Sequence, residues 1–161
     1  MLSNYEREDI WGDEIYYQIN QQGLCLKPVV SSKDAFKMMD IRHKVFINEQ
    51  NIKYEDEVIE NEEKEAKNFL FTLNEVPIGC IRYRVVDNQY KLERFAILKE
   101  YRGKGYGTKA LKLLCELAKN NGIKTLCDDI AIDNPSINIF KKNGFVEVFR
   151  TVNFIRVKKD L

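Results

Sequence analysis

Short runs of apolar residues separated by turn-forming residues occupy the middle of the chain. The runs cover residues 68–73, 78–86 and 89–97, and the gaps between them have the length of hairpin turns. One gap, residues 74–77, contains Asn74 and Pro77, and the other is the pair Asp87-Asn88. The pattern therefore predicts three consecutive strands in an antiparallel meander.

Two other segments have helical periodicity. Apolar residues recur at helical spacing between residues 110 and 118, with polar residues on the opposite face and Gly122 as a stop. Residues 35–41 repeat the pattern after Ser31 or Ser32, either of which can cap a helix, and it continues to Ile47.

Strand-like runs are also present near both ends of the chain. Residues 15–20 and 24–30 flank a turn at Gly23, and Pro28 predicts that the second run is an edge strand or is bulged. Residues 123–132 and 145–157 predict further strands on either side of a short helix at 135–143. This order predicts one α+β domain spanning residues 1–161.

Charge and composition narrow the classes of partner. Lys plus Arg number 26 against 25 for Asp plus Glu, so the net charge of +1 gives no field that would attract nucleic acid. The acidic start and the lack of a run of about 18 apolar residues predict a cytoplasmic protein that does not enter membranes. The four cysteines form no CxxC pair, so we expect free buried thiols and no metal site.

Acidic residues dominate the segment 55–65, which has little apolar content. Such a segment predicts a solvated loop or a frayed helix. An attraction for cationic amines is the alternative interpretation.

A glycine-rich loop joins the third predicted strand of the meander to the long helix. The loop is Arg102-Gly103-Lys104-Gly105-Tyr106-Gly107, and Thr108 follows it at the start of the helix. Its backbone N–H groups lie at the positive end of a helix, which suits a pyrophosphate, and Arg102 and Lys104 add positive charge. The loop matches neither GxxxxGK[ST] nor GxGxxG, and an ordinary turn is the alternative interpretation.

The loop also resembles the (Q/R)xxGx(G/A) motif of the GNAT acetyltransferase superfamily. Ser136 to Phe145 is similar to the AxxFYxKxGF segment of that family, and the resemblance covers about residues 24–157. Residues 1–23 form an N-terminal extension outside it. The resemblance implies a mixed, mainly antiparallel sheet with helices on both faces. Its two central strands, the one that ends at Ile97 and the one that begins at Ile123, would splay apart and leave a V-shaped gap.

The resemblance further implies that acetyl-CoA binds in this gap. The loop residues 102–107 and Thr108 would hold the pyrophosphate, and Asn134 and Phe140 would contact the coenzyme. The strand residues expected to pair with pantetheine are Phe95, Ala96 and Ile97. Phe140 occupies the position where many members have a tyrosine that protonates the leaving thiolate, and a phenyl ring cannot donate a proton.

A second, narrower resemblance lies at residues 41–50, which are similar to the LRxxVFxxEQ signature of a bacterial GNAT subgroup. It implies that Arg42, Phe46 and Glu49 contact the acceptor substrate. The alternative is that Phe46 belongs to the core and that Arg42 and Glu49 form a surface ion pair. His43, the only histidine, is interpreted as a surface or structural residue.

The function implied by these resemblances is direct transfer of an acetyl group to a primary amine of a small molecule, a lysine or an N-terminus. We expect Glu93 to act as the base through water, because it lies two residues before Phe95 and would share its face of the strand. A structural ion pair is the alternative for Glu93, and Asp128 and Asp129 are the next candidates.

Two other functions are compatible with the sequence. The phenylalanine at position 140 leaves open a non-catalytic acyl-CoA-binding or sensor module. An acyl-homoserine-lactone synthase is a second alternative, although the sequence lacks its other motifs. The family also includes homodimers that form through the terminal strands.

Overall fold

A mixed sheet of seven strands, in the order β1-β2-β3-β4-β5-β7-β6, organises the protein. The structure is a computed structural model, and it describes residues 23–161. The strands are β1 (Leu24–Pro28), β2 (Lys67–Leu73), β3 (Val76–Val86), β4 (Gln89–Ile97), β5 (Thr125–Ala131), β6 (Val146–Arg150) and β7 (Phe154–Asp160). Neighbouring strands are antiparallel except for β4 and β5, which are parallel.

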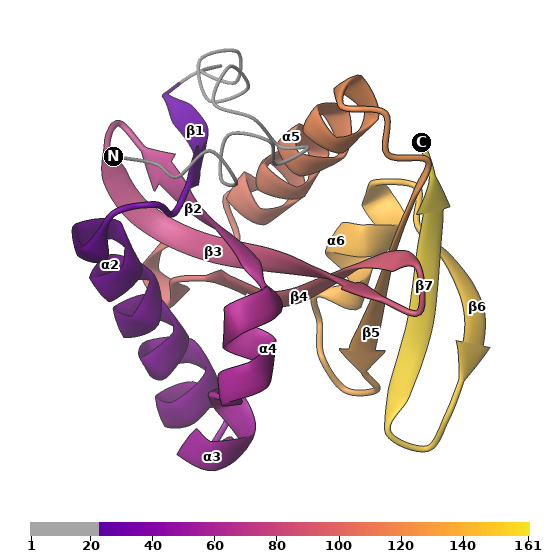
Figure 1. The fold of residues 1–161 in the computed structure, drawn as a ribbon, viewed down its shortest axis with the longest axis horizontal. Coiled ribbons are helices and arrows are strands. Elements are labelled where there is room, and N and C mark those ends of the chain that lie inside the picture. Colours follow the sequence, from indigo (N-terminus) through magenta and orange to yellow (C-terminus); the bar gives the residue numbers. More distant parts are fainter. Residues whose placement is uncertain (1–22) are drawn as a thin grey trace.

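The helices lie between the strands along the chain (Figure 1). They are α2 (Ser32–Arg42), the π-helix η2 (His43–Glu49), α3 (Tyr54–Glu57), α4 (Glu60–Glu65), the 3-10 turn η3 (Lys99–Tyr101), α5 (Tyr106–Asn120) and α6 (Ile137–Lys142). Ser31 caps α2, because its Oγ accepts a hydrogen bond from the Asp34 backbone N–H at 3.1 Å.

Each face of the sheet has its own apolar core. The larger core joins strand residues such as Phe71 and Leu92 to α5 and α6. The smaller core joins Leu70, Cys80 and Ala96 to α2 and η2. The predicted layering, with helices on both faces of the sheet, is confirmed.

The parallel pair in the centre of the sheet separates soon after it forms. Strands β4 and β5 pair through three residue pairs, of which Leu92 and Asp128 are the last. Beyond this pair, β4 runs on to Ile97 and β5 to Ala131 without pairing to each other. The predicted splay of the central strands is confirmed.

An extra residue in β4 marks the start of the splay. Arg82 pairs with Glu93, but Cys80 pairs with Ala96, so β4 has one residue more than β3 between these pairs. This is a β-bulge, and within it Arg94 has a φ of 52°, in the left-handed region. On β3, Gly79 leaves room for the bulged strand, since a Cβ there would lie 2.4 Å from the Ala96 carbonyl oxygen.

Most elements agree with the sequence prediction. Strand β1 is the sheet edge that Pro28 indicated, and β4, α5 and β5 form the predicted strand-helix-strand unit. Residues 55–65 form α3 and α4 for the most part, so the helical alternative for this segment is confirmed, but Glu57 is buried where a solvated segment was predicted. The strand predicted at residues 15–20 lies outside the described residues.

The substitution Gly79→Ala tests the close approach of β3 and β4. We expect a loss of about 1–3 kcal/mol in the free energy of unfolding, because the new methyl group collides with the Ala96 carbonyl and the backbone must move. Urea denaturation measures it, with Val85→Ala as the control at an exposed position of the same strand. An unchanged unfolding midpoint for Gly79→Ala would contradict this packing.

Candidate active site between the splayed strands

The separation of β4 and β5 opens into a cavity of about 1000 Å³. Its walls are the end of β4, the glycine-rich loop, the end of β5 with the segment 132–136 after it, and residues of η2, α6 and the β6–β7 turn. Of the predicted site residues, those that line it are Glu49, Phe95, Ala96, Ile97, Arg102, Gly103, Gly105, Tyr106, Gly107, Thr108 and Asn134. The structure thus brings most of the predicted coenzyme site together.

The loop has the backbone conformation that its glycines permit. Gly103 and Gly105 have φ values of 74° and 82°, and a Cβ on either would meet nothing within 4 Å. Gly107 serves packing instead, since a Cβ there would lie 2.8 Å from Ile139 Cδ1 on α6. The loop therefore leads directly into α5, a helix of 15 residues whose positive end faces the cavity.

Arg102 connects the loop to two other walls of the cavity. Its Nε donates to the Ile97 carbonyl at 2.8 Å, and its Nη1 and Nη2 donate to the two carboxylate oxygens of Glu49 at 2.7 and 3.0 Å. Both side chains are about one-third exposed or more, so the pair adds little to stability. It holds the loop against η2, and the ion pair proposed between Arg42 and Glu49 does not form.

Two of the predicted acceptor residues lie outside the cavity lining. Arg42 is 1% exposed, and its Nε donates to Glu57 Oε1 at 2.6 Å while its Nη2 donates to Glu63 Oε1 at 2.7 Å. Phe46 belongs to the smaller core. Of the signature segment 41–50, Glu49 therefore faces the cavity, together with Val45 and Gln50.

Two predicted coenzyme residues also fall outside the lining. Phe140 is 1% exposed, and its ring packs between those of Phe95 and Phe145 at centroid distances of 5.8 and 5.0 Å. Lys104 is exposed but does not line the cavity. Asn134 does line it, and its Oδ1 accepts the Ser136 backbone N–H at 2.9 Å, which leaves its amide NH₂ available to a ligand.

The simple alternation of a strand predicted that Glu93 and Phe95 share a face of the sheet. The structure shows that they do not. The bulge places Glu93 opposite Arg82, on the face of α4, whereas Phe95 packs against the core under α6. Glu93 accepts hydrogen bonds from Arg82 Nε at 2.9 Å and Arg84 Nη2 at 2.8 Å. Burial favours a higher pKa, but Arg84 and Arg82 outweigh it and lower the pKa of Glu93 to about 2.

Asp128 has the opposite electrostatic setting. It is 7% exposed and pairs with Leu92 at the point where the two strands part. Burial raises the pKa of Asp128 well above its usual value, and the nearby charge of Lys91 only partly offsets this effect. The neighbouring Asp129 instead forms an ion pair with Arg156, and its pKa is lowered.

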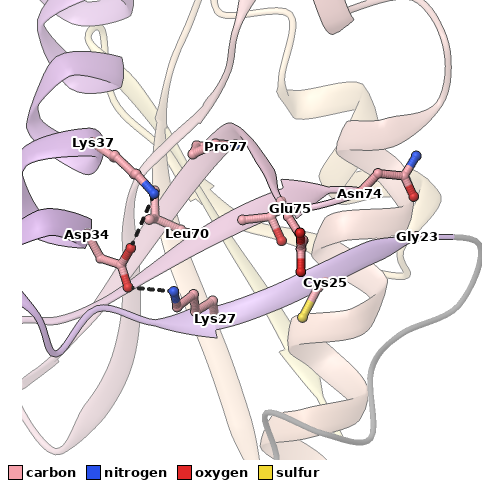
Figure 2. A pocket seen from close by; sticks show the side chains of 10 residues that line it. Gly23, Cys25, Lys27, Asp34, Lys37, Leu70, Asn74, Glu75 and Pro77 are labelled. Atoms are coloured by element: carbon pink, nitrogen blue, oxygen red, sulfur yellow. Dashed lines mark ion pairs between the residues drawn. The ribbon is translucent and has the colours of Figure 1, made fainter.

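A second hollow, of about 660 Å³, lies between β1, α2 and the β2–β3 turn (Figure 2). Three of its charged groups pair with one another, because Asp34 contacts Lys27 at 2.8 Å and Lys37 at 3.8 Å. None of the predicted site residues lines it. We therefore place the candidate active site in the cavity between β4 and β5.

Neither a metal centre nor a membrane helix is found in residues 23–161. No three His, Cys, Asp or Glu side chains of this part gather in a way that could hold a metal ion. No helix of the same part is long and apolar enough to cross a membrane.

Comparisons with a family model and with curated proteins both match acetyltransferases. The model of the Acetyltransferase (GNAT) family matches residues 35–145. The uncharacterised N-acetyltransferase YjcF of Bacillus subtilis is 33% identical over 113 residues, which are 70% of this chain and 76% of the relative.

Solved structures share the fold at lower identity. A putative N-acetyltransferase from Lactobacillus plantarum superposes with a TM-score of 0.75 at 18% identity, over 86% of this chain and 99% of the other. A GNAT family acetyltransferase from Elizabethkingia anophelis, solved with acetyl-CoA bound, superposes with a TM-score of 0.67 at 16% identity, over 88% of this chain and all of the other.

The pairing of Glu93 makes stability depend on pH. A folded-state pKa of about 2 against an ordinary value of 4.5 corresponds to about 3 kcal/mol, present above pH 4.5 and lost as the pH falls toward 2. We expect Glu93→Gln to destabilise the protein at pH 7 and to flatten the fall of unfolding free energy between pH 4.5 and 2. Urea titrations across this range measure it, and an unaltered pH dependence would contradict the assigned pairing.

Proposed function

Because the chain belongs to the GNAT family of acetyltransferases, we propose that it transfers the acetyl group of acetyl-CoA directly to a primary amine. The acceptor is a small molecule, or the amine of a lysine or an N-terminus. The observation that carries the proposal is the end of β4, which has no partner strand on the side of β5 and meets the glycine-rich loop in one cavity. The acetyl-CoA bound by the Elizabethkingia anophelis protein supports the choice of cosubstrate.

In this proposal the pyrophosphate binds at the loop. Backbone N–H groups of residues 102–107 and the start of α5 supply hydrogen bonds and a positive potential. Gly103 and Gly105 have open space where a side chain would stand, so a phosphate can approach the backbone. Arg102 is engaged with Glu49 and Ile97, so it shapes the loop and adds charge nearby.

Pantetheine lies along the end of β4. Residues 95–97 have no partner strand on the side of β5, and an extended chain with amide groups can satisfy that edge. The thioester then reaches the bulge at Arg94, where backbone N–H groups can stabilise the oxyanion that forms during transfer.

The chemistry is an attack of a neutral amine on the thioester carbonyl. The C–N bond forms, the C–S bond breaks, the nitrogen loses a proton and the thiolate gains one. Neither Glu93 nor Asp128 lines the cavity, so either carboxylate would act through water. Glu93, with a pKa of about 2, is a weak proton acceptor at neutral pH, whereas burial raises the pKa of Asp128, which lies where β4 and β5 part. We therefore favour Asp128 over Glu93, and water as the proton donor to the thiolate.

A homodimer through the terminal strands is part of the same proposal. Strand β6 forms an edge of the sheet, and all five of its residues are exposed. Three of them, Val146, Val148 and Phe149, are apolar, which supports contact with a second copy.

Stabilisation by acetyl-CoA tests the cosubstrate site. A ligand at 100 times its dissociation constant adds about 2.7 kcal/mol to the free energy of unfolding. We expect this gain in the wild type and its loss in the double variant Arg102→Ala, Gly105→Ala, measured by thermal denaturation.

The matched control is Lys64→Ala, Gly122→Ala. It removes an exposed ion-paired lysine and a glycine with a φ of 81° and open space around it, both outside the cavity lining. This variant should keep the full gain. An absence of stabilisation in the wild type at saturating acetyl-CoA would refute the proposal.

The acceptor and the base are tested together by a screen of primary amines. We expect release of the CoA thiol to depend on an amine, and mass spectrometry to identify the acetylated product. Asp128→Asn should lower kcat by about 100-fold and remove the acidic limb of the pH–rate profile. An unchanged profile would exclude Asp128, unchanged turnover of Glu93→Gln at every pH would exclude Glu93, and hydrolysis without any acetylated amine would favour the sensor alternative.

A further inference from the structure

Arg94 holds a backbone conformation that its residue type does not favour. Its φ of 52° lies in the left-handed region, where a long side chain is strained and where Gly, Asn or Asp are usual. Such a conformation persists only where the surrounding structure imposes it. We therefore expect contacts of Arg94 with the surrounding structure to hold this conformation, and with it the bulge in β4.

The side chain of Arg94 is bound to the turn at α3. Its Nη2 donates to the Glu57 carbonyl at 3.0 Å and to the Asp56 carbonyl at 3.3 Å, and its Nε lies 3.2 Å from Glu57 Oε1. On β3, the Cys80 thiol donates to the carbonyl of Arg94 at 3.5 Å. The bulge residue is thus held by its side chain and by its own backbone.

Glu57, in turn, is fixed by Arg42. Both residues are 1% exposed, and Arg42 reaches Glu57 twice, through Nε to Oε1 at 2.6 Å and through Nη2 to the carbonyl at 3.0 Å. Arg42 belongs to α2, which packs on the sheet through the smaller core. A chain of contacts therefore runs from α2 through α3 to the bulge.

The position of the bulge decides what β4 presents to the cavity. Successive residues of a strand alternate in the direction of their N–H and C=O groups, and an extra residue reverses that order beyond it. Here the reversal falls between Glu93 and Ala96, where pairing with β5 has already ended. A shift of the bulge by one residue would replace the groups that face the cavity along residues 95–97.

We propose that Arg94 is a positioning residue for acetyl transfer, which holds the β4 bulge so that backbone N–H groups point at the thioester carbonyl. Glu57 and Arg42 act through Arg94. This assignment rests on the proposed function. It gives Arg42, in the signature segment 41–50, an indirect role in positioning the thioester, and it requires no contact between Arg42 and the acceptor substrate.

The test uses the bound cosubstrate and needs no acceptor. Acetyl-CoA labelled with ¹³C at the acetyl carbonyl is added to the protein, and the carbonyl stretch is read by isotope-edited infrared spectroscopy. Hydrogen bonds from the bulge shift the stretch of bound acetyl-CoA to a lower frequency than that of free acetyl-CoA. We expect Arg94→Asn to bind acetyl-CoA and to lose most of this shift, because asparagine tolerates the left-handed region but cannot reach Glu57.

Arg84→Asn is the matched control. Arg84 belongs to the same set of ion pairs, through Glu93 and Glu62. Among residues 23–161, its ion pairs and hydrogen bonds involve neither Glu57 nor Arg94. It should lose stability and keep the wild-type carbonyl shift. Equal loss of the shift in both variants would assign Arg94 a merely structural role and overturn the proposal.

The remaining outcomes separate this inference from the proposed function. A wild type that does not bind acetyl-CoA refutes the proposed function, whereas one that binds it without a carbonyl shift refutes the role of the bulge. A wild-type shift in Arg94→Asn also overturns the inference. Should Arg94→Asn fail to fold, Arg94→Lys supplies the test, since it keeps the charge without the planar fork, and a wild-type shift in that variant overturns the inference equally.

Discussion

Strand pairing between β4 and β5 ends at Leu92 and Asp128, and the rest of the site depends on that early separation. A strand edge inside a protein has to satisfy its N–H and C=O groups. Further pairing with β5 would fill the cavity, and a covering helix would close it. Instead, the glycine-rich loop and α5 begin just beyond β4, so an unpaired edge and a positive helix end face one space.

Ion pairs in the interior connect α2, α3 and α4 to strands β3 and β4. Arg42, Arg82 and Arg94 meet carboxylates or carbonyls of α3, α4 and β4. Buried charges of this kind add little net stability, but removal of one partner leaves the other uncompensated, at about 3–5 kcal/mol. They consequently fix geometry more than they strengthen the fold, and the geometry they fix is that of the bulge. At the exposed side, the pair between Glu49 and Arg102 does the same for the loop.

Local periodicity was enough to predict much of this arrangement. Alternation and turns predicted the meander of β2, β3 and β4, helical spacing predicted α5, and the loop from residue 102 to 107 was found by its glycines. Contacts between residues far apart in the sequence could not be predicted in this way. Glu57 was interpreted as solvated because its partner Arg42 is 15 residues away, and Glu49 and Arg102 are 53 residues apart. Nothing local in β4 indicates a bulge at Arg94, so the face of Glu93 was assigned wrongly.

The most direct test of the central claim is a titration of ¹⁵N-labelled protein with acetyl-CoA, followed residue by residue through the backbone amide signals. The account predicts the largest changes in the bulge and strand end, residues 94–97, and in the loop, residues 102–108. Changes confined to the second hollow, around Gly23 to Lys27 and Asp34, or no changes at saturation, would contradict it.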